Sequence, residues 1–182
     1  NDLVRNLATS LLATAIPHSP PANPTALTTL LTFLSARLKD EPCVREVLRA
    51  SESLLLTSRA SVAPMLSAHA ECADAAGLLL AAVVRDVHVQ SLALGDRARA
   101  YRVIEACAFE FGVPLPERFV EGFCSAMDGE RDPRNLKTCF HIIPKIAERG
   151  LIATPEDADA VFSVSSCYFP VTFQPPPGDT VG

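Results

Sequence analysis

The chain has 182 residues, of which 48% are hydrophobic and 20% charged, and its 21 acidic and 16 basic residues give a net charge of -5. This composition excludes a disordered or collagen-like chain, and the length allows one large domain with a sizeable core. Because charges of both signs are scattered along the chain, we do not expect a general polyanion binder. The six cysteines lack both C-x-x-C spacing and the density of a disulfide scaffold, so we expect a reducing compartment, the cytoplasm or the nucleus.

Both ends of the sequence suggest a piece of a longer protein. The chain begins inside a helical pattern at residues 1–4 and stops in a proline-rich stretch at residues 175–182. We find no signal peptide, and the apolar run at residues 78–84 is much too short to cross a membrane. We therefore expect a fragment with no membrane association.

Residues 2–38 predict two helices joined by a stiff connector at residues 17–21, where prolines end the first helix. Asn23 followed by Pro24 is typical of a helix start, with the asparagine as cap and the proline in the first turn. The first helix carries apolar residues at helical spacing, namely Leu3, Leu7, Leu11 and Ala15. We expect the second helix to pack through Leu27, Leu30, Leu31, Leu34 and Leu38.

The next turn has the pattern of a helical repeat. It contains Asp40, and a further helix begins near Cys43 with Val44, Leu48 and Leu55 on its inner face. An aspartate in the turn, followed by Val-Arg at the start of the second helix, is typical of a HEAT repeat.

The middle of the chain predicts a second hairpin. Residues 61–75 contain Pro64 and few long apolar side chains, and we interpret them as a turn. Residues 78–84 predict a helix that ends at Arg85-Asp86. After a connector, another helix carries Tyr101, Ile104, Ala108 and Phe111, and residues 112–116 form a second proline-rich connector.

The third hairpin is centred on residues 127–136. The preceding helix packs through Phe119, Val120, Phe123, Cys124 and Met127, and Asp128 with Gly129 ends it. Asp132 caps the following helix and Pro133 is its first residue. That helix is predicted to pack through Leu136, Phe140, Ile143 and Ala147. The turn aspartates at positions 40, 86 and 128 are separated by 46 and 42 residues, which are HEAT or armadillo periods.

The last part of the sequence predicts one more helix and an extended tail. The chain turns at Arg149-Gly150, and Thr154 caps a helix that carries Ala158, Val161, Phe162 and Val164. Residues 167–177 alternate apolar and polar residues before three prolines, so we expect them to be extended. The prediction is therefore an all-α HEAT-repeat solenoid of three to four hairpins at residues 1–166, truncated at both ends. A proline-rich loop at residues 167–182 packs on the solenoid or leaves it.

Three segments of this sequence resemble the N-terminal region of the MMS-nineteen family. They are Val87-His-Val-Gln-Ser91, Met127-Asp-Gly-Glu-Arg-Asp-Pro-Arg-Asn-Leu136, and Ser166-Cys-Tyr-Phe-Pro170 with Phe173 and Pro175-Pro-Pro-Gly-Asp179. Residues 30–40 are similar to the family as well, whereas Pro144 departs from its pattern and is expected to kink the helix that contains it.

The resemblance implies a non-enzymatic HEAT-repeat adaptor of the cytosolic iron-sulfur protein assembly targeting complex. Such an adaptor helps to deliver iron-sulfur clusters to apo client proteins of DNA repair, replication and transcription, among them helicases, polymerases and repair enzymes. In the family, the assembly partners, a WD-repeat propeller protein and a small companion, bind C-terminal repeats that this sequence does not contain. The resemblance implies no cofactor, no metal site, no direct nucleic-acid binding and no membrane partner.

Two other functions are alternatives to this one. A HEAT-repeat scaffold that regulates transcription or repair, of the TFIIH type, or that acts in transport, would have the same fold without a role in cluster delivery. An enzyme is the alternative from another class. The four histidines are dispersed and suggest no Ser-His-Asp arrangement, and the chain has no glycine-rich phosphate loop.

The residues that carry the family motif also have structural explanations. We expect Arg134 to pair with the turn aspartate of a neighbouring repeat, as Asp40 and Arg45 suggest, and we expect the cysteines to be buried structural thiols. The apolar tail residues either pack across the solenoid or bind a partner. The motif positions are Asp128, Gly129, Asp132, Pro133, Arg134, Asn135, Cys167, Tyr168, Phe169, Pro170, Phe173, Pro175, Pro176 and Pro177.

A set of basic residues is a candidate surface for acidic client segments. The second helices of HEAT hairpins line one side of the array, which would bring these bases together, although they could equally be ordinary solvated helix faces. The set is Arg45, Arg49, Arg97, Arg99, Arg102 and Lys137.

Overall fold

Residues 2–169, the part of the chain that the computed structural model describes, form nine α-helices and no strand. Short 3₁₀ or π-type turns precede or extend several of them, at residues 41–43, 53–57, 89–91 and 106–110. The helices are α1 Asp2–Ala15, α2 Pro24–Arg37, α3 Val44–Glu52, α4 Arg59–Ala68, α5 Ala70–Asp86, α6 Leu94–Glu105, α7 Phe119–Met127, α8 Pro133–Glu148 and α9 Pro155–Ser166.

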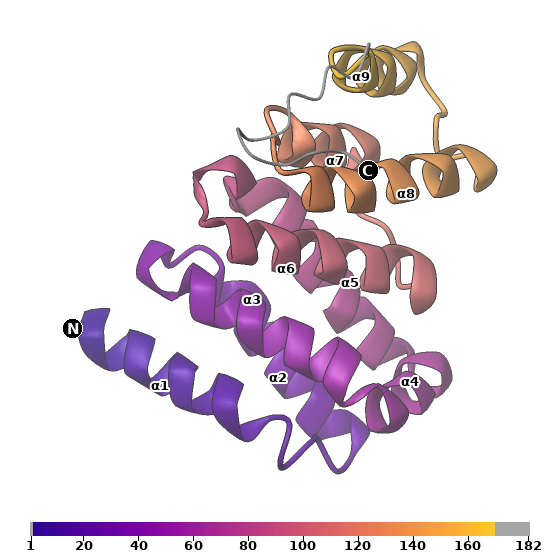
Figure 1. Ribbon diagram of the computed structural model, residues 1–182. Coiled ribbons are helices and arrows are strands. Elements are labelled where there is room, and N and C mark those ends of the chain that lie inside the picture. Colours follow the sequence, from indigo (N-terminus) through magenta and orange to yellow (C-terminus); the bar gives the residue numbers. More distant parts are fainter. Residues whose placement is uncertain (1, 170–182) are drawn as a thin grey trace, which may run out of the picture.

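The helices stack in two layers, as Figure 1 shows. In one layer, which we call layer A, α2 packs on α5, α5 on α7 and α7 on α9. In the other, layer B, α1 packs on α3, α3 on α6 and α6 on α8. The pairs α2–α3, α5–α6 and α7–α8 are the three predicted hairpins, and Asp40, Asp86 and Asp128 lie in or beside their turns. The prediction of an all-α solenoid is confirmed. Its HEAT subtype and the boundary at residue 166 stay predictions.

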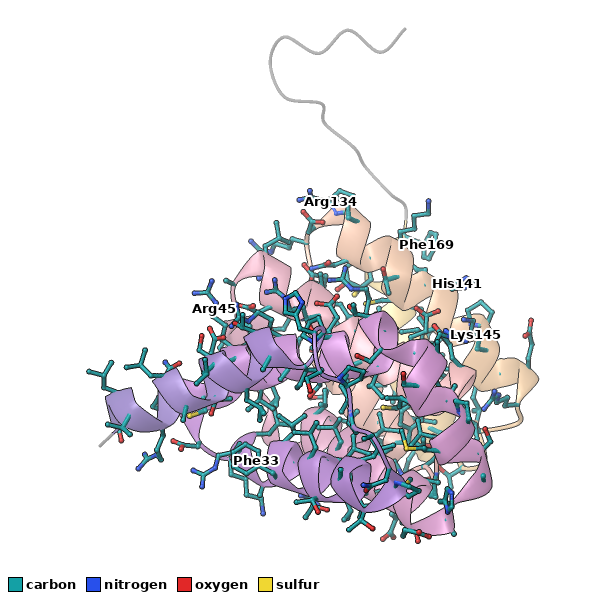
Figure 2. The ribbon with its side chains drawn as sticks, turned by 90° about the horizontal axis from the view of Figure 1, so that it is seen from below. Phe33, Arg45, Arg134, His141, Lys145 and Phe169 are labelled. Atoms are coloured by element: carbon teal, nitrogen blue, oxygen red, sulfur yellow. The ribbon has the colours of Figure 1, made fainter. Side chains whose placement is uncertain are left out.

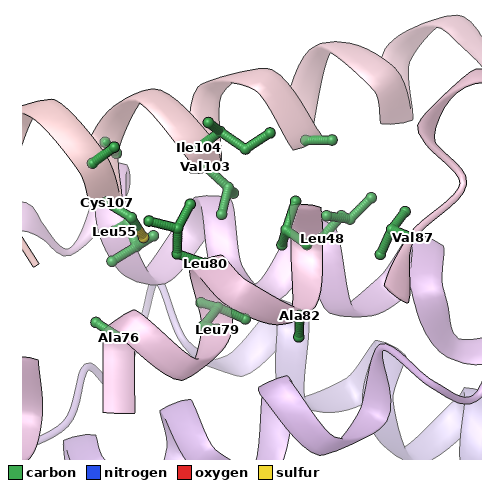
Figure 3. Close-up of a cluster of buried hydrophobic side chains, with 14 of the residues drawn as sticks. Leu48, Leu55, Ala76, Leu79, Leu80, Ala82, Val87, Val103, Ile104 and Cys107 are labelled. Atoms are coloured by element: carbon green, nitrogen blue, oxygen red, sulfur yellow. The ribbon is translucent and has the colours of Figure 1, made fainter. Parts of the chain in front are cut away.

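The core lies between the layers and continues from one hairpin to the next. Leu79 and Leu80 of α5 meet Leu48 of α3 and Ile104 of α6 within one cluster of buried side chains (Figure 3), and all four are fully buried. Because each hairpin buries its apolar face mainly against its neighbours, the fold is stabilised by stacking along the array.

Local sequence signals place the helix ends where they were predicted. Asn23 accepts a hydrogen bond from the backbone N–H of Ala26 in α2. Asp132 accepts hydrogen bonds from the backbone N–H groups of Arg134 and Asn135 in the first turn of α8. Thr154 and Asp157 form a reciprocal capping box at the start of α9. Gly129 and Gly150 end their helices with positive φ angles of 84° and 65°, a conformation that glycine adopts without strain.

The prediction of a turn at residues 61–75 is wrong, because α4 and the first part of α5 occupy this stretch. Val62 and Leu66 are buried even though Pro64 lies inside α4. In α5, the buried residues at positions 75 and 76 are alanines, Ala75 and Ala76, and not long apolar residues. Alanine has the highest helix propensity and allows close helix packing, so few large side chains are needed here.

The apolar face of α8 differs from the prediction by one residue. Cys139, Ile142 and Ile146 are fully buried, whereas the predicted set of Leu136, Phe140, Ile143 and Ala147 is only partly buried or exposed. A shift of one residue turns a helix by about 100°, so α8 has a second apolar face beside its core face.

Two other helices also expose residues from their predicted apolar sets. In α1, Leu3, Leu7 and Leu11 are exposed, while Thr9 and Ala13 face the core. In α9, Val164 is buried, whereas Phe162 and Ala158 are exposed.

No single helix within residues 2–169 has both the length and the apolar composition needed to span a membrane. Only α4 and α5 taken together meet that measure, and they are bent by 111° relative to each other.

Candidate functional site

The described parts of the three segments that carry the family resemblance meet at one place in the fold, which we call the junction. Gln90, in the turn between α5 and α6, donates a hydrogen bond of 2.6 Å to the carbonyl of Ala126 at the end of α7. Tyr168, which follows α9, donates one of 3.1 Å to the carbonyl of Met127. Segments that lie far apart in the sequence are therefore held against the turn between α7 and α8.

Glu130 is the centre of the junction, and its side chain is completely buried. Arg97 of α6 donates to both carboxylate oxygens, at 2.9 and 3.0 Å. The backbone N–H groups of Arg131 and Asp132 donate to Oε1 at 2.9 and 3.0 Å, and Asn135 Nδ2 donates to Oε2 at 3.0 Å. A buried carboxylate is tolerated only when it is paired and hydrogen-bonded in this way.

Tyr101 extends this polar network into the core. Its hydroxyl accepts a hydrogen bond of 2.9 Å from Gln90 and lies 3.1 Å from the carbonyl oxygen of Ala126 and 3.2 Å from Glu130 Oε2. The single hydroxyl proton is donated to one of these two oxygens at a time. The network joins α6, α7 and α8 to the turn before α6.

The electrostatics of the junction follow from burial and hydrogen bonding. Burial alone would raise the pKa of Glu130, but the hydrogen bonds from Arg97, the two backbone N–H groups and Asn135 lower that pKa to about 2. The same contact with Glu130 raises the pKa of Arg97. Burial raises the pKa of Tyr101 far above its ordinary value. At neutral pH the network therefore contains a fixed Arg–Glu ion pair and a neutral phenol.

The predicted motif residues of the α7–α8 turn have structural positions. Asp128 and Gly129 end α7, Asp132 caps α8 and Pro133 is its first residue, as predicted. Asn135 is buried, and its Nδ2 also lies 3.5 Å from the carbonyl oxygen of Leu94.

The predicted pairing of Arg134 with a neighbouring turn aspartate is wrong. Arg134 contacts Asp132 in its own turn at 3.0 Å and is 79% exposed. Likewise, Asp40 does not pair with Arg45, because Arg5 of α1 donates to it at 2.7 Å.

Pairing between neighbouring hairpins does occur, with other residues. An arginine near the start of each of the helices α1, α3 and α6 reaches an acid in the next hairpin along the chain. The pairs are Arg5–Asp40 at 2.7 Å, Arg45–Asp96 at 3.7 Å and Arg97–Glu130 at 2.9 Å. We call these three pairs the inter-repeat ladder.

The described part of the predicted tail packs against α8. Tyr168 makes an edge-on contact with Phe140 at 5.7 Å between ring centroids, and Phe169 a tilted contact at 5.8 Å. Phe169 itself stays exposed, and Figure 2 shows it on the same side of the molecule as Arg134 and His141. Cys167 is exposed, with its thiol 3.2 Å from the carbonyl of Val164. The other predicted tail residues, Pro170, Phe173, Pro175, Pro176 and Pro177, lie outside the described residues.

The candidate basic residues lie in layer B, on α3, α6 and α8, and most of them pair with acids. Arg99 and Arg102 both contact Glu52, at 3.2 and 2.6 Å. Arg49 contacts Glu46 and donates to Ser10, and Arg97 is held at the junction. Three members are exposed: Arg45, whose side chain is 74% exposed, Arg102 and Lys137.

The cysteines show no grouping for a metal within residues 2–169, where no cluster of three or more His, Cys, Asp or Glu side chains has suitable geometry. Cys43, Cys72, Cys107, Cys124 and Cys139 are buried. Burial raises the thiol pKa of Cys107 and Cys139 to about 12 and that of Cys124 to about 11. These thiols are protonated at neutral pH, whereas a metal ligand must be a thiolate.

Sequence reasoning missed three residues of the junction: Glu130, Gln90 and Tyr101 in its polar role. Glu130 and Gln90 lie inside segments chosen for their family resemblance, but no spacing rule links them. Only the stacking of the hairpins brings positions 40 residues apart into contact.

The fold and the junction define a segment of an α-solenoid whose buried polar residues hold successive hairpins together. The chain belongs to the family described as Dos2-interacting transcription regulator of RNA-Pol-II, whose model matches residues 1–182. The predicted membership of the MMS-nineteen family is thereby confirmed.

Similar proteins are named MMS19 nucleotide excision repair protein homolog. The protein from Bos taurus is 37% identical over 160 residues, which cover 84% of this chain and 14% of the relative. The one from Xenopus tropicalis is 35% identical over 156 residues, with the same coverage. The one from Arabidopsis thaliana is 30% identical over 183 residues, covering 95% of this chain and 15% of the relative. The chain thus spans about one seventh of the length of these relatives.

Proposed function

We propose that this chain is part of a non-enzymatic adaptor that helps to deliver iron-sulfur clusters to apo client proteins of DNA repair, replication and transcription. The match of the family model to residues 1–182 is the observation that carries the proposal. The relatives are named as nucleotide excision repair protein homologs, and the family is described as interacting with a protein partner and regulating transcription. In this proposal the adaptor works in the cytoplasm and the nucleus.

The architecture supports a role in binding proteins. Stacked hairpins present long surfaces made of successive helices, and such surfaces are used mainly for protein partners. In layer B the polar side chains bind one another across helices, as Glu52 does with Arg99 and Arg102. Iron-sulfur clusters are the cargo in this proposal, and the buried cysteines serve the core. The assembly partners bind parts of the full-length protein beyond this segment.

The second candidate is a scaffold that regulates transcription or repair without a role in cluster delivery. The description of the family as a transcription regulator favours it. The two functions differ in the chemistry of the clients, because only the first predicts that clients lose iron when the adaptor is absent.

The test is radioactive iron incorporation into two immunoprecipitated clients after depletion of the full-length protein. One client is a helicase that carries an iron-sulfur cluster, and the other is an iron enzyme that has no cluster. Cluster delivery predicts a loss of iron from the helicase alone, restored by re-expression of the full-length protein. If helicase iron is unchanged while transcript levels of repair genes fall, the second candidate replaces the first.

The accessible bases of layer B can be tested as a client surface in the full-length protein. We compare a double Arg45→Glu/Lys137→Glu variant with a control Arg134→Glu variant, which is similarly exposed but lies in the turn before α8. A client with an acidic segment should be captured less by the double variant and normally by the control. Equal capture by all three proteins rules out this surface. Reversing Arg45 removes its pair with Asp96 at 3.7 Å, so the free energy of unfolding of the double variant is measured as well. Reversing Arg99 or Arg102 would break the closer pairs with Glu52, at 3.2 and 2.6 Å.

A further inference from the structure

Three hollows border the solvent-facing side of α7 in layer A. One of about 560 Å³ lies between α7 and α5, and one of about 440 Å³ lies between α7 and α9. A smaller one of about 210 Å³ lies where α5 ends. Ser125 lines all three hollows, and Glu121 lines the two larger ones. Because the hollows share these residues, they form one branched surface among residues 81–89, 116–128 and 156–167, which we call the furrow.

The furrow exists because α7 has short side chains where it faces its neighbours. Gly122 lies against α5, and a Cβ atom there would come within 3.1 Å of the Cβ atom of Val84. The two helices therefore approach closely at this point. Ser125 is exposed and fills little of the space between the helices on either side. The sequence of α7 thus leaves a recess along the row of α5, α7 and α9, which Figure 1 shows in this order.

The furrow carries more negative than positive charge. Its arginines are already paired within the chain, Arg85 with Asp86 at 2.8 Å and Arg118 with Glu121. Three further carboxylates line it, those of Glu117, Asp128 and Glu156. All three side chains are exposed, and none of them makes a hydrogen bond or an ion pair within residues 2–169. The furrow therefore has unpaired negative charge along its length.

Asp128 lies where negative charge is already concentrated. The C-terminal end of a helix carries a partial negative charge, which basic residues in the last turn normally offset. Neither α7 nor α9 has a basic residue in its last turn. Asp128 follows α7 and Cys167 follows α9, and both line the same hollow. An acid in this position lowers stability unless a cation from elsewhere lies beside it.

The rest of the lining suits a long side chain with a cationic end. Val84, Ala160 and Val164 provide apolar walls. The aliphatic stems of lysine and arginine pack on such walls while their charged ends reach carboxylates. The thiol of Cys124 also lines the furrow, is 5% exposed as a residue, and has no hydrogen-bond partner among the described residues. Its sulfur is a weak acceptor for the N–H groups of a bound cation.

We propose that the furrow binds a lysine- or arginine-rich segment of a protein partner. The unpaired carboxylates would repel a nucleic acid, whose backbone is negatively charged. Within residues 2–169, no group of three or more His, Cys, Asp or Glu side chains could hold a metal ion. The hollows extend along three successive helices of layer A, so the occupant is a stretch of chain. This surface is separate from the exposed bases of layer B and takes a partner of the opposite charge.

The first experiment measures binding of a fluorescent peptide of alternating lysine and serine to the full-length protein, by fluorescence anisotropy. Asp128→Lys is compared with Glu148→Lys, which reverses an exposed acid at the end of α8, outside the furrow. Neither acid has an ion pair within the described residues, and the two variants change the net charge equally.

We expect Asp128→Lys to bind the peptide at least about fivefold more weakly than the natural protein, because an attraction becomes a repulsion. Glu148→Lys should bind it normally. Equal affinity of the two variants, or no binding by the natural protein, overturns the proposal.

A second pair of variants fills space without changing charge. Ser125→Trp places a large side chain where the three hollows meet, and Ser67→Trp makes the same change at an exposed serine of α4. We expect only Ser125→Trp to lose peptide binding, and thermal unfolding of both variants shows whether the fold is kept. Undiminished binding by folded Ser125→Trp protein overturns the proposal.

The third experiment tests the chemistry of the partner. A photo-crosslinking residue replaces Ser163, which is exposed and lines the furrow from α9, in the full-length protein in cells. We expect crosslinked partner peptides that are rich in lysine or arginine, with a lower yield when Asp128→Lys is also present. Acidic or apolar peptides, peptides from a second copy of this chain, crosslinked nucleic acid, or a yield that does not depend on Asp128 overturns the proposal.

Discussion

Glu130 and Arg97 show how a buried charge can hold two hairpins together. Glu130 is buried and receives hydrogen bonds from Arg97, Asn135 and two backbone N–H groups, so nearly all of its acceptor capacity is used. The pair Asp132–Arg134, only two residues further on, has similar chemistry but lies in solvent. Because water screens the second pair and not the first, the two should differ strongly in energy.

The first prediction compares these two arginines. Arg97→Ala leaves the carboxylate of Glu130 buried without its ion-pair partner, which should lower the free energy of unfolding by about 3 kcal/mol. Arg134→Ala removes an exposed pair and should cost less than about 1 kcal/mol. Urea denaturation of the two variants measures the difference. Equal losses would show that the junction contributes no more than a surface pair.

The second prediction concerns acid. The pKa of Glu130 is lowered to about 2 from its ordinary 4.5, so the unfolded chain binds a proton at higher pH than the folded chain does. The resulting stabilisation is fully present above about pH 5 and is lost as the pH falls from about 4.5 towards 2. Glu130→Gln, which cannot ionise, should therefore lose less stability than the natural chain over this interval.

The measurement is the free energy of unfolding at several pH values between 2 and 7. A constant difference between Glu130→Gln and the natural chain across this range would exclude Glu130 as the titrating group.

At the scale of elements, two glycines differ in the space around them. Gly77 lies on α5 where the connector after α6 crosses it, and a Cβ atom there would come within 2.8 Å of the carbonyl oxygen of Pro114. Gly95, in the first turn of α6, has only the tip of Arg99 nearby, at 3.9 Å. The connector can approach α5 this closely only because glycine has no side chain at position 77. Nothing packs so closely on Gly95.

The third prediction is that the same substitution has opposite effects at these two positions. Gly77→Ala should destabilise the protein by about 1–3 kcal/mol, because the backbone of the connector must move. Gly95→Ala should stabilise it by about 0.5–1 kcal/mol, because alanine favours the helix and meets open space. Thermal unfolding of both variants gives the signs. A stabilising Gly77→Ala would mean that the connector does not pack on α5 as described.

The sequence predicted those elements whose signals are local. Helix starts at Asn23, Asp132 and Thr154 depend on caps and prolines within a few residues, and all three were confirmed. Residues 61–75 were misjudged because alanine-rich helices that pack closely lack the large apolar stripe by which helices are recognised.

The face of α8 was misjudged for a different reason. Both Ile142 and Ile143 are apolar, so periodicity alone does not choose which of two adjacent stripes meets the core. The junction was beyond prediction for a third reason, since Arg97 and Glu130 are distant in sequence and meet only after the hairpins stack.

At the scale of the whole molecule, the main helix–helix contacts within residues 2–169 join neighbouring hairpins. The inter-repeat ladder follows this rule, because Arg5, Arg45 and Arg97 each reach only the next hairpin. Within the described residues, α9 packs mainly on α7, whereas α5 meets helices of both layers. The stability of such an array is the sum of its hairpins and their interfaces, so its ends should open at lower free energy than its centre.

The fourth prediction tests this difference in opening free energy between the ends and the centre of the array, by amide hydrogen exchange of two variants. Thr154→Ala removes the capping box of α9 and should lower the opening free energy of α9 amides by about 1 kcal/mol, with α3 and α5 unchanged. Leu80→Ala removes a fully buried side chain of α5 and should lower protection in α3, α5 and α6 together by about 2–5 kcal/mol. Equal loss of protection in all helices of the Thr154→Ala variant would mean that the segment unfolds as one cooperative unit, with the junction coupling α9 to the centre through Tyr168.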